Sequence, residues 1–108
     1  MNQLNLTNQL KNLDFVTKTI SQIEKDFTRC TIEINISNFR DRDSLENGIL
    51  KAIQNLNTDK LQQLIYIIDI PEKEYASILG SEFFYRALAE KILRREALKV
   101  FLRENLSV

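Results

Sequence analysis

The stretch KLQQLIYIIDI, residues 60–70, decides the fold class that the sequence predicts. Its apolar side chains at positions 61, 64, 65 and 68 have the spacing of one helix face. Against that, Leu64 to Ile68 is a continuous run rich in β-branched and aromatic residues, which favours a buried strand. We interpret residues 63–70 as a strand and keep a helix over residues 60–70 as the alternative.

A second strand is predicted by the stretch CTIEINIS, residues 30–37. Apolar and polar side chains alternate along it, with Cys30, Ile32, Ile34 and Ile36 on one side. A period of two is typical of a half-buried strand whose other face lies in water or at the edge of a sheet. In this position Cys30 is expected to be a small core residue rather than a reactive thiol.

Helices are predicted around these strands. Apolar residues at spacings of three and four run from Leu6 to Phe27 and predict one amphipathic helix, with Asn5 or Thr7 as its cap. After the strand at residues 30–37, a helix over residues 43–56 contains Gly48, which indicates close backbone packing at that point.

The capping box that opens the helix over residues 43–56 consists of Asp43 and Glu46. Pro71 suits the first position of a short helix that ends at Gly80. Ser81 then caps the last helix, which we expect over residues 82–105.

Together these elements give the order α-β-α-β-α-α in a single domain that spans residues 1–108. A strand-helix-strand unit implies a right-handed crossover and a parallel pair. We therefore expect an α+β or small α/β fold, with two parallel strands covered by helices. Because a two-stranded sheet is rarely stable in water, its edges need cover from charge, from a loop or from another chain.

The last helix carries two apolar stripes, whereas a helix that covers a single core needs only one. The second stripe indicates contacts either with other helices of the same domain or with a partner. Together with the unprotected sheet edge, it leads us to predict a homodimer. The residues expected at its interface are Leu6, Leu10 and Leu13 of the first helix and Ala89, Leu93, Ala97, Val100 and Phe101 of the last.

Acidic residues follow both predicted strands. In a parallel sheet the carboxyl ends of the strands meet at one edge, where Asp41, Asp69 and Glu72 could hold Mg²⁺ or another ligand. The competing interpretation is that they cap helices or form solvated ion pairs, and we favour it, with Asp69 as the cap of the helix that begins at Pro71.

The composition excludes several kinds of chemistry. The chain has no histidine and one cysteine, so neither a Ser-His nor a Cys-His nucleophile nor a histidine-ligated metal is possible. No glycine-rich phosphate loop is present, and no cofactor is expected. Lysine plus arginine equals aspartate plus glutamate at 15 each, and acids are interleaved with the basic residues of the last helix, so nucleic-acid binding is not favoured.

The sequence also gives expectations about location. No signal peptide is visible and no apolar run is long enough to span a membrane. A single free thiol suits a reducing compartment, so we expect a cytoplasmic protein. The leading functional hypothesis is a small, non-catalytic interaction or assembly module that homodimerises. The alternatives are a small ligand-binding or Mg²⁺-binding domain or enzyme that uses the carboxylates at the strand ends, and a nucleic-acid-binding regulator.

Overall fold

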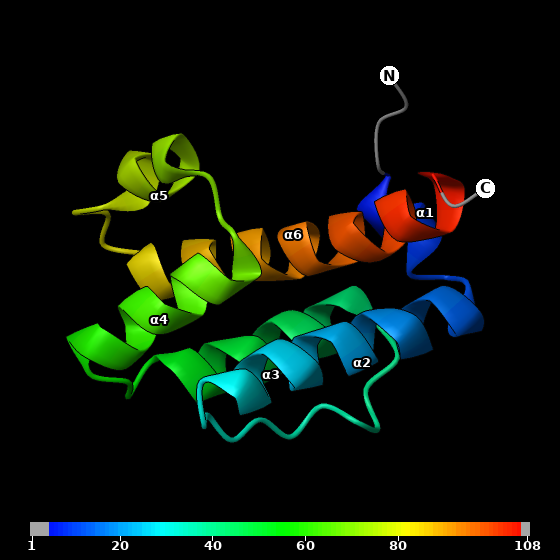
Figure 1. Ribbon diagram of the computed structural model, residues 1–108, viewed down its shortest axis with the longest axis horizontal. Coiled ribbons are helices and arrows are strands. Elements are labelled where there is room, and N and C mark those ends of the chain that lie inside the picture. The colour runs from blue at the N-terminus through cyan, green and yellow to red at the C-terminus, as the bar shows by residue number, and fades with distance from the viewer. Residues whose placement is uncertain (1–4, 107–108) are drawn as a thin grey trace.

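The structure is a computed structural model that describes residues 5–106, and every regular element in this range is a helix (Figure 1). The helices are α1 (Leu6–Gln9), α2 (Leu13–Arg29), α3 (Arg42–Ile53), α4 (Thr58–Ile68), α5 (Glu72–Ile78) and α6 (Phe84–Leu106). The prediction of an α+β or small α/β fold with two parallel strands is therefore wrong, because residues 5–106 contain no strand.

The stretch at residues 60–70 forms α4, so the helical alternative is correct. Helical spacing buries all four of its stripe residues, Leu61, Leu64, Ile65 and Ile68. A strand would have pointed Leu64 and Ile65 to opposite faces. Strand propensity reflects packing against neighbouring strands, and within the described residues this segment has none beside it.

The segment at residues 30–37 runs from α2 to α3 without regular structure. Burial alternates along it as the sequence predicts: Cys30, Ile32 and Ile36 are buried, and the residues between them are exposed, except for the half-buried Ile34. The predicted strand is nevertheless wrong, because no other segment of residues 5–106 forms a ladder with it. Figure 1 shows this segment passing along the lower side of α2 and α3.

The apolar stripe from Leu6 to Phe27 forms two helices instead of one. Asn12 separates them by capping α2, and its side chain accepts a hydrogen bond from the Phe15 N–H at 3.2 Å. Asn5 caps α1 in the same way, as the sequence predicts. The break leaves Leu13 exposed, although the stripe placed it on the buried face.

The N-cap of helix α3 lies two residues earlier than predicted. Its N-cap is Asp41 rather than Asp43, and the Asp41 carboxylate accepts a hydrogen bond from the Ser44 N–H at 2.9 Å. The close packing predicted at Gly48 is confirmed. A Cβ atom on this residue would overlap Ile36 and lie 2.9 Å from the Phe39 ring.

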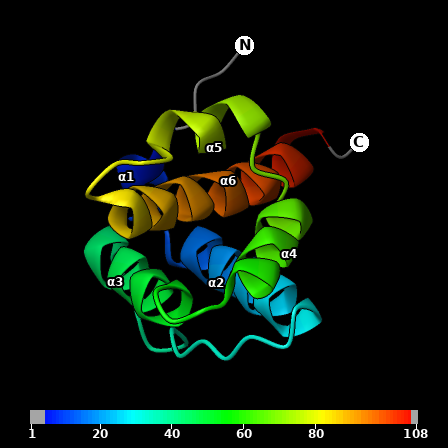
Figure 2. The ribbon, with the colours of Figure 1, turned by 90° about the vertical axis from the view of Figure 1, so that its left-hand side faces the viewer.

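Helix α6 lies at the centre of the molecule. Seen end-on, it has α5 above it, α2 and α3 below it and α4 to one side (Figure 2), and it packs against all four. Its two apolar stripes therefore meet two different sets of neighbours within the same chain. Leu88, Ile92, Ala89 and Leu93, two from each stripe, are fully buried.

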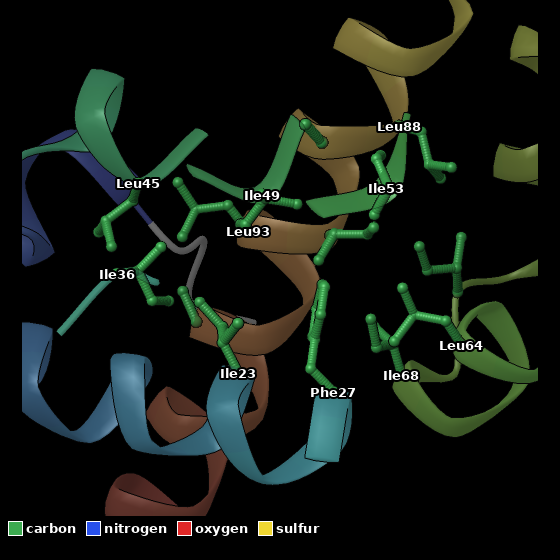
Figure 3. Close-up of a cluster of buried hydrophobic side chains, with 14 of the residues drawn as sticks. Ile23, Phe27, Ile36, Leu45, Ile49, Ile53, Leu64, Ile68, Leu88 and Leu93 are labelled. Carbon is green, nitrogen blue, oxygen red and sulfur yellow. The ribbon is translucent and has the colours of Figure 1, made fainter. Parts of the chain in front are cut away.

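The buried side chains form one continuous cluster around α6. Side chains from four helices and from the α2–α3 connection point toward one another in it (Figure 3). Its labelled members are Ile23 and Phe27 of α2, Ile36 of the connection, Leu45, Ile49 and Ile53 of α3, Leu64 and Ile68 of α4, and Leu88 and Leu93 of α6. No helix within residues 5–106 is long and apolar enough to cross a membrane.

Candidate functional site

A groove with an apolar floor separates α4 from α5. Its volume is about 510 Å³, and its apolar lining consists of Ile65, Tyr66, Ile70, Tyr75, Ala76 and Leu79. We call it the α4–α5 groove. Ile65 and Ile70 form its buried floor, whereas Tyr66 and Leu79 are 82% and 57% exposed.

The groove exists because the chain turns sharply between the two helices. Asp69 ends α4 in the left-handed conformation, with φ 68°, and its N–H bonds to the Ile65 carbonyl at 3.0 Å. The Ile70 N–H bonds to the same carbonyl at 3.2 Å, which completes the helix C-cap. Pro71 then fixes the direction in which α5 leaves. Asp69 is thus the cap of α4, and the prediction that it caps the helix after Pro71 is wrong.

Two contacts hold α5 in place across the groove. The Gln62 amide donates a hydrogen bond to the Tyr75 hydroxyl at 3.3 Å. The Tyr75 ring meets the Phe84 ring of α6 edge to face, with 5.9 Å between the ring centroids. Ile78 is the one buried side chain of α5, so these contacts and the Glu74–Lys91 ion pair help to position the upper wall of the groove.

Exposed large apolar side chains concentrate around this part of the molecule. Five are exposed among the described residues, and four of them, Tyr66, Leu79, Phe83 and Tyr85, come from α4, from the α5–α6 connection or from the start of α6. The fifth, Leu13, is 64% exposed at the start of α2. Of the four, Tyr66 and Leu79 line the groove, whereas Phe83 and Tyr85 do not. Isolated exposed apolar residues are ordinary, but exposed apolar side chains at the edge of an apolar groove are typical of an interaction site.

The charged residues that line the groove are both acidic. Asp69 pairs with Arg95 of α6, with 2.8 Å between the carboxylate and guanidinium groups. Glu72, in the first turn of α5, forms no ion pair within residues 5–106. The rim of the groove therefore carries two carboxylates, and Arg95 compensates the charge of Asp69.

A second groove of about 550 Å³ lies between the α2–α3 connection and α3. Its lining is mixed, with Glu33, Asn35, Asn47 and Lys51 beside Phe39. It contains no exposed large apolar side chain among the described residues. Its surface therefore offers less to a partner than the α4–α5 groove does.

A buried polar cluster lies between α2 and α6. Glu96 is fully buried and Asp26 is nearly so, and Lys99 Nζ lies 2.6 Å from an oxygen of each. Lys99 and Gln22 donate hydrogen bonds to Asp26. Within residues 5–106 no donor reaches either Glu96 oxygen in hydrogen-bond geometry, and Lys99 makes only a close approach to it.

The two carboxyl groups of this cluster differ in their protonation. Burial, reinforced by the hydrogen bond to Asp26, raises the pKa of Glu96 to about 9. Burial also acts to raise the pKa of Asp26, but hydrogen bonds from Glu96, Lys99 and Gln22 outweigh it and hold that pKa below its usual value. At neutral pH, Glu96 is thus the protonated member and Asp26 the ionised one.

The cluster belongs to the α2–α6 interface, and its two carboxyl groups line neither of the grooves described above. Sequence reasoning missed both carboxyl groups, although a signal was present. Asp26 follows Ile23 by three positions, and Glu96 follows Leu93 by three and precedes Val100 by four. Each is a charged residue at a position where the helical spacing of the apolar residues predicts burial.

The predicted interface residues lie mainly inside the protein. Leu6, Leu10, Ala89, Leu93, Ala97 and Val100 are buried in its core, Phe101 is partly buried against it, and only Leu13 is exposed. Because the second stripe of α6 already has neighbours within the chain, it no longer argues for a second copy. Self-association itself stays a prediction.

The three candidate metal ligands are not brought together as a site. Asp69 and Glu72 both line the α4–α5 groove, whereas Asp41 caps α3. The sheet edge at which they were expected to converge does not exist in the described residues. No group of three or more carboxylate, thiol or imidazole side chains in residues 5–106 is arranged to hold a metal ion.

The basic residues of α6 are largely paired with acids. Lys91, Arg94, Arg95 and Lys99 each lie within 4 Å of a carboxylate oxygen, at 3.7, 3.2, 2.8 and 2.6 Å. A row of such pairs leaves little free positive charge for phosphate groups.

The chain was compared with models of protein families, with curated proteins and with solved structures, and none of them matches it.

Proposed function

We propose that the protein is a non-catalytic interaction module, and that the α4–α5 groove is its contact face. The observation that carries this proposal is the exposure of Tyr66 and Leu79 at the edge of a groove whose floor, Ile65 and Ile70, is already apolar. Elsewhere in the described residues the large apolar side chains are mostly enclosed in the core.

The energetics suit a contact of moderate strength. Fully burying one large apolar side chain contributes roughly 1.5–3 kcal/mol. Tyr66 and Leu79 together therefore supply a few kcal/mol, and the floor of the groove adds to this. Aromatic residues are over-represented among the side chains that dominate binding energy at protein interfaces, and Tyr66 is positioned to be one of them.

We further propose that this module works in the cytoplasm. Support comes from Cys30, the single cysteine of the chain, which is a free and buried thiol. Burial raises its pKa, so it behaves as a small core residue rather than as a nucleophile. A homodimer is one form that the proposed interaction can take, and the experiment below includes it.

The proposal is tested by site-specific photo-crosslinking in the cells that make the protein. A benzophenone side chain replaces Leu79 in one variant and Leu13 in the other, because the two leucines are similarly exposed and only Leu79 lines the groove. We expect a discrete adduct at position 79 that Tyr66→Ser removes, and none at position 13. An adduct of twice the chain mass identifies a second copy.

Sedimentation velocity on the purified protein provides the second measurement. If the protein self-associates through the groove, Leu79→Ser shifts it to the monomer and Leu13→Ser does not. A protein that sediments as a monomer and forms no adduct specific to position 79 would contradict the proposed function.

A further inference from the structure

The walls of the α4–α5 groove restrict the kind of chain that fits it. Both walls are helices, so they offer no strand edge to an extended peptide. A partner that lies in an apolar groove must satisfy its own backbone groups, and an α-helix does so. The groove is thus suited to a helix that presents one apolar face.

Charge restricts the partner further. The charged residues of the lining are Asp69 and Glu72, and no lysine or arginine lines the groove. Carboxylates beside an apolar floor complement a helix with basic residues flanking its apolar face. A second copy of this chain would instead bring its own Asp69 and Glu72 to the contact, and an anionic lipid surface would be repelled in the same way.

From these observations, and resting on the proposed function, we propose that the α4–α5 groove binds a basic amphipathic helix of another protein. Tyr66 and Leu79 hold the apolar face of this helix, and Glu72 pairs with a lysine or arginine at its flank. Asp69 is already paired with Arg95, so Glu72 is the carboxylate with free capacity.

The test uses two synthetic helical peptides as probes. Each is about 14 residues long, or about 21 Å as a helix, with leucines at helical spacing. One carries lysines at the flanking positions and the other carries glutamates. Binding to the full-length protein is measured by fluorescence anisotropy at low and at physiological salt. We expect the lysine peptide to bind more tightly than the glutamate peptide, with a difference that shrinks as salt rises.

Two matched pairs of variants locate the interaction. Leu79→Ser is expected to weaken binding of the lysine peptide by about tenfold, whereas Leu13→Ser leaves it unchanged. Glu72→Lys is expected to weaken it by roughly threefold to tenfold at low salt. Glu82→Lys changes the net charge equally at an exposed position that does not line the groove, and is expected to have little effect.

The outcomes separate the two proposals. Equal binding of both peptides, or equal effects of Glu72→Lys and Glu82→Lys, overturns the basic helix and leaves the groove as a contact face if Leu79→Ser still weakens binding. Self-association or binding to anionic vesicles that Leu79→Ser abolishes likewise overturns this choice of partner. If Leu79→Ser alters neither peptide binding, self-association nor vesicle binding, both proposals fail.

Discussion

Replacing Glu96 with glutamine should stabilise the protein, and the gain should grow with pH. Glu96 is fully buried beside Asp26, and its pKa is raised from 4.5 to about 9. A carboxyl group whose pKa is higher in the folded state makes its full contribution to stability below the unfolded pKa. As pH rises from about 4.5 toward 9, the unfolded chain releases the proton while the folded one keeps it, so the free energy of unfolding falls. Glutamine resembles the protonated acid in shape and can donate to Asp26, but it does not titrate.

The magnitude follows from the pKa difference. Each unit corresponds to about 1.36 kcal/mol, so the wild-type protein at pH 7 has lost about 3 kcal/mol relative to pH 4.5. At pH 9 the loss approaches about 6 kcal/mol if Glu96 alone titrates. We therefore expect Glu96→Gln to equal the wild type near pH 4.5 and to exceed it by about 3 kcal/mol at pH 7.

Few other groups interfere in this window. The chain contains no histidine. Asp26, whose folded pKa is lowered from 3.8, gives stability that is lost only as pH falls below that range.

The assay is urea unfolding followed by circular dichroism at pH 5, 7 and 9. Glu82→Gln serves as the control, because it makes the same substitution at an exposed glutamate. The wild type and Glu82→Gln should lose stability in parallel as pH rises, and the Glu96→Gln curve should stay nearly flat. Parallel pH dependence of all three proteins would refute the buried, protonated state of Glu96.

Three further predictions concern the core. Gly48→Ala should lower the free energy of unfolding by about 1–3 kcal/mol, because the added methyl group would overlap Ile36; an alanine variant as stable as the wild type in urea would show that this contact yields without cost. Leu93→Ala should cost about 2–5 kcal/mol, since Leu93 is fully buried in the central helix, and thermal unfolding would reveal a smaller loss if the site can collapse. The buried Cys30 thiol, whose pKa is raised by burial, should react slowly with Ellman's reagent in the native protein and quickly in urea; fast native labelling at neutral pH would contradict its position in the core.

Several local features of the structure could be predicted from the sequence, although the fold class could not. The cap at Asn5, the tight packing at Gly48 and the alternating burial of Ile32 and Ile36 were all predicted from the sequence and are present in the structure. These features depend on a residue and its near neighbours along the chain. Each could therefore be inferred without knowing which segments meet in space.

The strand assignments failed because they depended on partners that lie far away in sequence. For residues 60–70 the helical spacing and the strand propensity pointed in opposite directions, and β-branched residues such as Ile65 and Ile68 are tolerated in a helix when one side of it is buried. The predicted strand at residues 30–37 needs a neighbouring strand, and residues 60–70, which form α4, do not provide one. Both strand predictions thus failed for the same reason, the absence of a neighbouring strand within residues 5–106.

The candidate site was missed for the same reason. Tyr66 was interpreted as a residue in a buried run, whereas the helix turns it to the surface at the edge of the groove. The sequence did single out Asp69 and Glu72, but for a sheet edge rather than for a groove between helices. Leu79, which follows α5 directly, carried no pattern that marks an exposed contact.

The central position of α6 also constrains how the chain acquires its structure during synthesis. All the segments that it packs against, α2 to α5, leave the ribosome before it does. At about 5–20 residues per second, the 23 residues of α6 take about 1–5 s to translate. Through that interval the earlier helices lack the helix that covers them, so the core cannot close until α6 has been translated, and chaperones have those seconds in which to bind.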